Sequence, residues 1–417
     1  MTDPIRMLHF ADIHIGMENY GRIDPETGLN TRVLDFLRRM DEMIEYARNE
    51  DIDLTIFAGD AFKTRTPNPT FQREFAWRVR DLIAIAPLVL LVGNHDLQPN
   101  ALKASSIEIY DTLAVPNVWV ADKYEWREIQ TKRGPVAVGA APYPLRARVL
   151  QDVGTHGLSI AETDTVLQAE LARIIEAMAA EVDAFDMPRV LTGHFTINGA
   201  AIGSERQIML GRDIQLAPSV LADPRWDYVA MGHVHKHQDI SAGRAGVPPI
   251  VYSGSMERID FGEEGDPKGF CRVDLARNAT TWHFQTVRAR PFLTLRMDLR
   301  ESADPTQEAL NMIDEYDVKH AVVRMILQLT PETAAQLNEA VLREKFRTDG
   351  ASFIATIRKE IEQPARARLG ESPEGLSDLE LLERYLMSKD VPLDRRQQLV
   401  SAADTLLSEH IVVTEDE

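Results

Sequence analysis

The chain of 417 residues contains five short polar clusters, and an apolar run precedes each of them. In chain order the clusters contain Asp12 and His14; Asp60; Asn94, His95 and Asp96; His194; and His233 with His235. Carboxylate, amide and imidazole groups are side chains through which proteins bind divalent cations by oxygen or nitrogen. If each apolar run is a strand, its end delivers one cluster to the edge of a sheet. We therefore expect a fold in which five strand ends converge.

Apolar runs alternate with helical repeats in the first quarter of the chain. Short apolar runs cover residues 7–11, 53–58 and 87–92, and apolar residues recur at helical spacing over 29–49 and 70–85. Continuous apolar strands that are separated by helices are typical of a buried, mainly parallel sheet. The first three clusters are therefore expected at one carboxyl edge of this sheet.

The next part of the chain is richer in strand patterns. Strands are predicted at 117–120, 124–130, 136–140, 188–192, 227–231, 250–252, 269–274 and 281–287, with a long helix over about 163–182. The last two clusters follow two of these strands. Together the elements predict a layered α/β sandwich that ends near residue 290.

The pattern changes after residue 290, where a small separate α/β unit is predicted. Its elements are strands at 292–299 and 321–329 and helices at 305–316 and 331–347, the last with a proline in its first turn. A stretch rich in Pro, Gly, Glu and Ser at 363–377 is interpreted as a linker. Two amphipathic helices, 378–387 and 393–407, are then expected, and their leucines need a further partner.

Composition limits the class of protein. With 44% hydrophobic and 27% charged residues, the chain has the composition of a soluble globular protein. The single cysteine, Cys271, excludes an intramolecular disulfide and a cysteine-rich zinc site, and it suits a reducing compartment. The N-terminus lacks the pattern of a secretory leader, and no run approaches the ~18 apolar residues of a membrane helix. We expect a cytoplasmic protein that does not span a membrane.

The formal net charge of -19, taken alone, argues against a partner with a phosphate backbone. The charge is unevenly distributed, because residues 371–417 hold 12 acidic and 4 basic side chains. Bound cations would also offset the carboxylates of the clusters. The net charge therefore does not exclude a nucleic acid.

The ligand types in the clusters suit two cations. Two divalent cations about 3.5–4 Å apart can activate a water molecule and clamp the oxygens of a phosphate, and a bridging carboxylate holds them that close. Asp60 suits the bridge. Asp12 and His14 are two residues apart, so they supply a carboxylate and an imidazole from the same side of one strand end.

The remaining clusters complete this arrangement. His233 and His235 have the same spacing, and we expect one of them at each ion. Asn94 offers a neutral carbonyl oxygen, while His95 beside it is free to donate a proton to a leaving oxygen. A single cluster of this kind is more often an ordinary loop or turn. Five in succession, with ligands for two filled sites, favour a metal centre.

Taken together, the five clusters resemble the calcineurin-type metallophosphoesterase superfamily. The segment from Tyr252 to Glu264, followed by Lys268-Gly-Phe270, resembles a narrower branch, the SbcD or Mre-type nucleases of double-strand-break repair. The resemblance covers nearly the whole chain, although it is loose in the C-terminal tail. It implies a four-layer α/β/β/α sandwich over residues 1–290, a small α/β cap domain over 291–362, a linker over 363–377 and a helical tail over 378–417.

The resemblance also implies roles for individual residues. One manganese ion would be held by Asp12, His14, Asp60 and His235, and the other by Asp60, Asn94, His194 and His233. Magnesium or another divalent cation is the alternative metal. His95 would be the general acid.

Activity and partners follow from the same resemblance. It implies Mn²⁺-dependent exonuclease and endonuclease action on DNA ends and hairpins. It also implies a homodimer in complex with an SbcC-type, SMC-like ATPase, with the C-terminal helices as the docking site.

Lys63 departs from the pattern of the family. Three residues after the bridging aspartate, related enzymes often carry a His or Asp that orients the acid histidine or touches phosphate. A lysine can contact a phosphate as a point charge, but its side chain cannot accept a hydrogen bond from His95. Asp96 is the second candidate for that orienting role, and Lys63 can equally be a solvated loop cation.

Few other cations lie near the clusters in sequence. The candidate DNA contacts are Lys63, Arg65, Arg206, Arg212 and Lys236. Such side chains would contact phosphates and so fix position without reading bases. The alternative for each is an ordinary solvated surface charge.

Two other functions remain open at this stage. The same site on a different substrate would make a phosphatase or phosphodiesterase, because a fold does not dictate function. A second alternative is a protein that chiefly binds DNA ends. The Tyr252–Glu264 segment and the tail disfavour the first alternative, and the complete ligand set disfavours the second.

Overall fold

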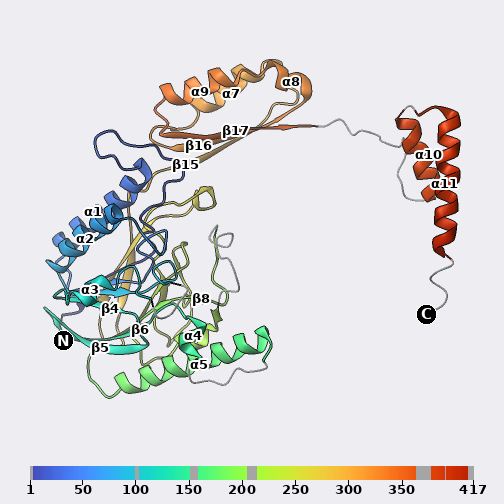
Figure 1. The fold of residues 1–417 in the computed structure, drawn as a ribbon. Coiled ribbons are helices and arrows are strands. Elements are labelled where there is room, and N and C mark those ends of the chain that lie inside the picture. The colour runs from blue at the N-terminus through green and yellow to red at the C-terminus, as the bar shows by residue number, and fades with distance from the viewer. Residues whose placement is uncertain are drawn as a thin grey trace. The chain divides into compact units, whose positions relative to one another are not determined.

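Two mixed sheets organise the first part of the chain in a computed structural model (Figure 1). The structure describes residues 3–98, 103–150, 158–203, 214–362, 377–389 and 391–411. Within these residues the first sheet has, in pairing order, β14 (Thr281–Thr286), β13 (Gly269–Leu275), β1 (Ile5–Phe10), β2 (Leu54–Phe57), β3 (Leu88–Leu91) and β4 (Val118–Ala121). The second has β11 (Gln238–Asp239), β12 (Ile250–Tyr252), β10 (Tyr228–Gly232), β7 (Arg189–His194), β6 (Gly134–Ala141) and β5 (Glu125–Thr131).

The strands that carry the polar clusters are central and parallel. β1 pairs in parallel with β2, and β2 with β3, so these three strands end at the same edge of the first sheet. In the second sheet β7 and β10 are also parallel, with Gly232 opposite His194 at their ends. β2 and β3 are buried at every position, which explains why their sequences are continuously apolar.

Helices cover the outer face of each sheet. The first sheet carries α1 (Thr31–Asn49), α2 (Pro69–Ile83) and α3 (Ile109–Thr112). The second carries α4 (Arg146–Val149), α5 (Ile160–Val182) and α6 (Pro218–Leu221), and a small parallel pair, β8 (Thr196–Ile197) with β9 (Gln215–Leu216), adjoins it. The starts of the two longest of these helices are capped by side chains, by Asn30 at α1 and by a Ser159–Glu162 capping box at α5.

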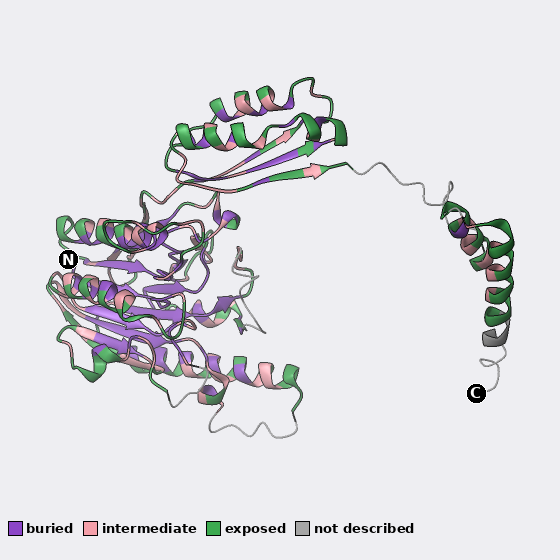
Figure 2. Ribbon diagram, turned by 45° about the horizontal axis from the view of Figure 1, so that its top comes forward, coloured by how far each residue is buried: buried purple, intermediate pink, exposed green. Residues whose placement is uncertain are grey.

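Three apolar cores separate these four layers. One lies between α1, α2 and the first sheet, and another between α5 and the second sheet. The third core joins the two sheets, with Met7, Leu54 and Val89 on one side and Val190 and Ala230 on the other. Figure 2 shows the central strands of the two sheets almost wholly buried, and the helices that cover these sheets with both buried and exposed positions. The predicted four-layer α/β/β/α sandwich is confirmed.

A three-stranded sheet follows, in the order β15 (Phe292–Asp298), β16 (Val322–Leu329) and β17 (Phe353–Ile361). Its helices are α7 (Pro305–Asp314), α8 (Pro331–Gln336) and α9 (Glu339–Thr348). The predicted single helix over 331–347 is wrong, because the extended backbone of Leu337 ends α8 and this side chain is buried. Strand β17 was not predicted from the sequence, and Ile357 is its one buried position.

Two helices form the described part of the tail, α10 (Asp378–Ser388) and α11 (Leu393–Ile411). They contact each other, and Ser377 caps α10. The predicted linker lies outside the described residues except for Ser377.

Contacts along the chain define two compact units. The first comprises Met1–Arg296, Leu310–Met325 and Glu339–Ile357, and the second Met297–Ala309, Ile326–Asn338 and Arg358–Glu417. All residues of the polar clusters belong to the first unit. In the portion that the structure describes, no helix combines the length and apolarity needed to cross a bilayer.

Candidate dinuclear metal centre

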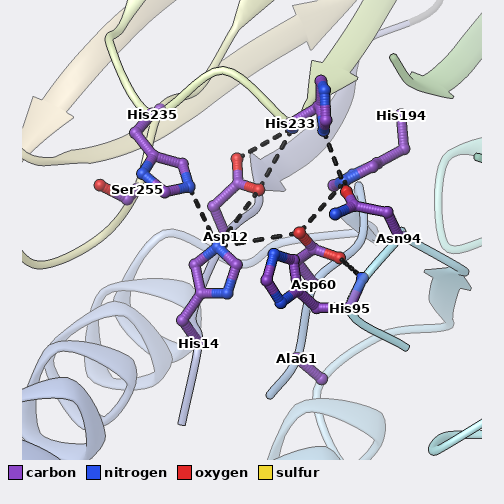
Figure 3. A network of polar contacts seen from close by, with 12 residues as sticks. Asp12, His14, Asp60, Ala61, Asn94, His95, His194, His233, His235 and Ser255 are labelled. Atoms are coloured by element: carbon purple, nitrogen blue, oxygen red, sulfur yellow. Dashed lines mark hydrogen bonds and ion pairs between the residues drawn. The ribbon is translucent and has the colours of Figure 1, made fainter. Parts of the chain in front are cut away.

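The first two clusters are held together by their backbones. The N–H of Asp12 donates to the carbonyl of Gly59 at 3.0 Å, and the N–H groups of Ile13 and His14 donate to the carbonyl of Asp60 at 3.0 and 3.1 Å. The loops that follow β1 and β2 are thus bound edge to edge. Their functional side chains project into one space (Figure 3).

Several predicted ligands adopt a left-handed backbone conformation. The φ angles are 54° at Asp12, 48° at His14, 65° at Asp60 and 91° at His233. Residues other than glycine rarely occupy this region, because it costs about 1–3 kcal/mol and persists only where the surroundings impose it. The structure imposes it at the strand ends that carry the ligands.

The glycines before the ligands allow close approach. A Cβ at Gly93 would lie 2.2 Å from Asp60 Oδ1, and a Cβ at Gly232 would lie 2.1 Å from the carbonyl oxygen of Ala58. No side chain fits in either position. The Gly-Asn and Gly-His pairs in the sequence therefore reflect the crowding of backbones at the meeting point of the two sheets.

The first candidate cation position is surrounded by Asp12, His14, Asp60 and His235. His14 Nε2 lies 3.0 Å from His235 Nε2, 4.0 Å from Asp12 Oδ1 and 3.8 Å from Asp60 Oδ2. All four side chains are at least 94% buried. Asp12, His14 and His235 can direct their donor atoms at one ion.

The second candidate position is surrounded by Asp60, Asn94, His194 and His233. His194 Nε2 lies 3.3 Å from Asp60 Oδ2 and 3.0 Å from Asn94 Oδ1, and His233 Nδ1 lies 3.0 Å from the same amide oxygen. Asp60 faces both positions, through contacts of one oxygen with His14 and with His194. This is the placement that a bridging carboxylate requires.

The outer nitrogens of two ligand histidines are occupied by the protein. Nδ1 of His194 donates to the carbonyl oxygen of Ala58 at 2.6 Å. Nδ1 of His235 lies 2.9 Å from Glu263 Oε1 and donates to this carboxylate. Each ring therefore presents the lone pair of Nε2 to the centre of the site, which is the form that binds a metal.

His95 is oriented by a backbone carbonyl. Its Nδ1 lies 2.8 Å from the carbonyl oxygen of Lys63, so Nδ1 donates and Nε2 is left for exchange with a substrate. Its N–H donates to Asp60 Oδ1 at 2.8 Å, which ties it to the bridging carboxylate. The missing acceptor at position 63 is thus replaced by the main chain.

The prediction that Asp96 orients His95 is wrong. The carboxylate of Asp96 is fully buried and accepts hydrogen bonds from the N–H groups of Asp60, Ala61 and Gly93 and from the hydroxyl of Ser106. Burial, together with the nearby charge of Asp60, raises the pKa of Asp96 to about 6. Asp96 therefore holds the loops in place and does not contact the acid histidine.

Buried carboxylates draw positive charge into the site. Burial opposes an ionised Asp60, but His194 and His95 outweigh burial and hold the pKa of Asp60 well below its usual value. Burial likewise opposes a charged His194, but Asp60 raises the pKa of His194 to about 9. A carboxylate, imidazole and amide set that attracts positive charge in this way fits divalent cations.

The site opens into a pocket of about 330 Å³. Its lining includes five of the predicted metal ligands and His95, together with Met17, Asn19, Lys63 and Ile259. Met17 and Ile259 are more than 90% buried and give the pocket an apolar wall. The pocket can therefore accommodate both a charged group and an apolar group of a bound molecule beside the metal-binding side chains.

The five predicted DNA contacts differ in their position relative to the pocket. Lys63 lines the pocket, and the exposed Arg65 donates to the backbone carbonyl of Asn94 at 3.4 Å. Lys236 is exposed and forms an ion pair with Asp266 at 3.7 Å. Arg206 and Arg212 lie outside the described residues.

Comparisons with known proteins agree with this geometry. Residues 5–237 match the family model described as Calcineurin-like phosphoesterase. The SbcD component of the nuclease SbcCD from Rhodobacter capsulatus is 27% identical over 74% of this chain and 75% of its own length. Its namesake from Escherichia coli K12 is 25% identical over 97% of this chain and 100% of its own.

A solved structure of a dimetal phosphatase from Danio rerio matches 68% of this chain and 96% of its own, with a TM-score of 0.42 and 10% identity. The resemblances recognised in the sequence, to the metallophosphoesterases and to SbcD proteins, are confirmed by the family and relatives found. The family model spans more than half of the chain and includes all five polar clusters. The chain belongs to the calcineurin-like phosphoesterase family.

Proposed function

We propose that this chain is the metal-dependent DNA nuclease component of a larger complex and hydrolyses phosphodiester bonds at DNA ends and hairpins. One observation carries the proposal: five of the seven predicted metal ligands line one pocket together with His95, and Asp60 faces two candidate cation positions. The other two ligands, Asp12 and His194, contact ligands that line this pocket. The choice of DNA among phosphate esters is supported by the relatives, which are named as components of a nuclease.

The ligand set suits two Mn²⁺ ions, with Asp12, His14 and His235 at one, Asn94, His194 and His233 at the other, and Asp60 between them. When bound, such ions activate a water molecule and neutralise the charge of a phosphate. Carboxylate oxygens with imidazole nitrogens also suit Zn²⁺ or Fe²⁺, so the metal itself must be measured.

The protein's own groups supply the remaining chemistry. His95 lines the pocket and its Nδ1 is engaged by the Lys63 carbonyl, so Nε2 is the nitrogen that would donate a proton to the leaving 3′- or 5′-oxygen of the cleaved bond. Lys63 would contact a flanking phosphate as a point charge. Met17 and Ile259 would exclude water on one side of the scissile group.

Partners enter the proposal through the tail. Exposed apolar side chains on α10 and α11 include Tyr385, Met387, Leu393, Leu406 and Leu407. We propose that these two helices dock on an SbcC-type ATPase, that the nuclease works as a homodimer in the cytoplasm, and that residues 1–290, 291–362 and 378–417 act as nuclease, cap and docking tail.

The test is an assay of purified protein with and without Mn²⁺ on three substrates: hairpin DNA, a phosphopeptide and bis-nitrophenyl phosphate. Metal-dependent cleavage of hairpin DNA is expected. Activity on the phosphopeptide with no action on DNA would replace the nuclease by a phosphatase. Tight DNA binding without hydrolysis of any substrate would instead favour a protein that chiefly binds DNA ends.

A further inference from the structure

A buried ion pair lies directly behind one of the ligand histidines. Lys268 Nζ is 2.8 Å from Glu263 Oε2, and neither side chain is exposed to solvent. Burying two charges carries a desolvation cost for each ion, which their mutual attraction must offset. Such a pair therefore calls for a reason beyond stability. Its position supplies one.

Glu263 contacts the ring of His235. Its Oε1 accepts the hydrogen bond from His235 Nδ1 at 2.9 Å, while Oε2 accepts from the N–H of Ile259 at 3.0 Å. Glu263 is the last residue of a short 3-10 helix, η2 (Phe261–Glu263), whose Asp260 cap fixes its start. The carboxylate is therefore held from two directions while it meets the imidazole.

Lys268 holds the backbone around the same histidine. Besides Glu263, its Nζ donates to the hydroxyl of Ser255 at 2.8 Å and to the carbonyl of His235 at 3.2 Å. The N–H of Ser255 donates to that same carbonyl at 3.0 Å, and Ser255 forms a β-bridge with Ala11, the neighbour of Asp12. The buried ammonium of Lys268 thus contacts the Glu263 carboxylate, the main chain of His235, and Ser255, which pairs with the residue beside Asp12.

His194, a ligand histidine of the second candidate position, has a weaker partner at its Nδ1 than His235 has. Nδ1 of His194 donates to the neutral carbonyl of Ala58, whereas Nδ1 of His235 donates to an ionised carboxylate. A carboxylate behind an imidazole fixes its tautomer and raises its basicity as a ligand more than a carbonyl does. The two candidate cation positions therefore differ in the basicity of these histidine ligands.

We propose that Glu263 and Lys268 are positioning residues: they fix the tautomer and direction of the His235 ring and so set the affinity of the cation that His235 binds. The inference rests on the proposed function only in that the site takes divalent cations. It requires no particular substrate.

The test measures Mn²⁺ binding without DNA, by calorimetric titration of the full chain. Glu263→Gln keeps the size of the side chain but removes its charge. We expect one of two binding steps to weaken by about 10- to 100-fold, the range typical of lost outer partners of metal ligands. Unchanged affinities would overturn the proposal.

Two comparisons separate positioning from stability. Asp53→Asn removes another fully buried carboxylate, which lies outside the polar clusters and forms an ion pair with Arg133 at 2.6 Å. This substitution should lower the melting temperature without changing the Mn²⁺ affinity. The double variant E263Q/K268M removes both charges and should recover most of the melting temperature that E263Q loses. Its Mn²⁺ affinity should stay low. Recovery of both quantities would mean that the pair only stabilises the fold.

A measurement on the unaltered protein needs no variant to fold. In ¹⁵N-histidine spectra of the metal-free chain, with the signals of His235 identified by their loss in His235→Asn, Nδ1 should carry the proton. A proton on Nε2 would contradict the proposed orientation. A native chain that binds two Mn²⁺ ions yet leaves DNA intact would sink the proposed nuclease and leave this inference standing.

Discussion

His95 shows how a single residue acquires its role from a neighbour's main chain. Its Nδ1 is engaged by the carbonyl of Lys63 and its backbone by Asp60, so the ring has one free nitrogen. The carbonyl is present whatever side chain stands at position 63. This separates two functions that the sequence placed together, the orientation of the acid and the contact with phosphate.

For His95→Asn we expect intact metal and DNA binding with a loss of cleavage of about 10²–10⁴-fold, because proton donation alone is removed. Elemental analysis checks metal content, and single-turnover assays on hairpin DNA check the rate. Loss of metal from the variant would reassign His95 to the ligand set.

For Lys63→Ala we expect an unchanged single-turnover rate at saturating DNA, because His95 keeps its carbonyl partner. DNA binding should weaken, and the slope of log K against log salt should fall by about 1, as expected for one lost phosphate contact. Titrations at several salt concentrations provide the measurement. A drop in rate with unchanged binding would mean that the side chain itself positions the acid.

His9 gives the site a pH-sensitive support. It is fully buried on β1, where Nε2 donates to the Met231 carbonyl and Nδ1 accepts from the Tyr228 hydroxyl, each at 3.1 Å. Burial lowers the pKa of His9 to about 3. The unfolded chain binds this proton below about pH 6.5 and the folded chain only near pH 3, so stability falls as the pH drops through this window.

His9→Gln removes that linkage. Between pH 7 and pH 5 the free energy of unfolding of this variant should fall by roughly 2 kcal/mol less than that of the native chain. This is the effect of one proton that only the unfolded chain binds over about 1.5 pH units below pH 6.5. Urea unfolding at both pH values measures the difference. Parallel pH dependences of the two proteins would show that His9 takes up its proton in the folded chain as readily as in the unfolded chain.

At the scale of elements, the site depends on how closely two sheets meet. β10 ends at Gly232 beside the loop that follows β2, and a Cβ there would also lie 2.9 Å from Nδ1 of His194. The same contact carries the Ala58–His194 hydrogen bond. The meeting of the strand ends and the orientation of a ligand are therefore one structural feature.

For Gly232→Ala we expect a loss of about 1–3 kcal/mol in the free energy of unfolding, since backbone must shift to admit the methyl group. Mn²⁺ affinity should fall as well, because His194 moves with the Ala58 carbonyl. Gly265→Ala is the matched control, since a Cβ there meets nothing within 4 Å. Equal behaviour of the two variants in urea unfolding and Mn²⁺ titration would refute the packing argument.

At the scale of the whole molecule, charge and metal chemistry are separated along the chain. The five clusters belong to one compact unit, while residues 371–417 hold 12 acidic and 4 basic side chains and the exposed leucines of α11. Removing the tail should therefore leave the metal centre intact.

A chain that ends at Gly370 is expected to keep Mn²⁺-dependent cleavage of hairpin DNA within about twofold of the full chain, and to lose association with an SbcC-type ATPase. Pull-down and nuclease assays on the same preparations test both parts. ATPase binding by the truncated chain would place the docking surface elsewhere.

The ligands could be predicted because of how buried parallel strands are built. A strand covered on both faces is apolar throughout, so the first polar residues after β1, β2, β3, β7 and β10 stand out at their ends. The apolar pattern does not reveal β17, which has a single buried position, or the break at the buried Leu337 within the predicted 331–347 helix. Weak or interrupted periodicity hides an element from the sequence.

The sequence by itself determined the layers of the sandwich and the types of side chain at its edge, because apolar runs predict the strands and the polar residues after them predict the ligands. Only the tertiary structure decided what stands behind each functional ring: the carbonyl of Lys63 behind His95, that of Ala58 behind His194, and Glu263 with Lys268 behind His235. A carbonyl is common to every residue, and a buried ion pair joins positions that no local pattern links.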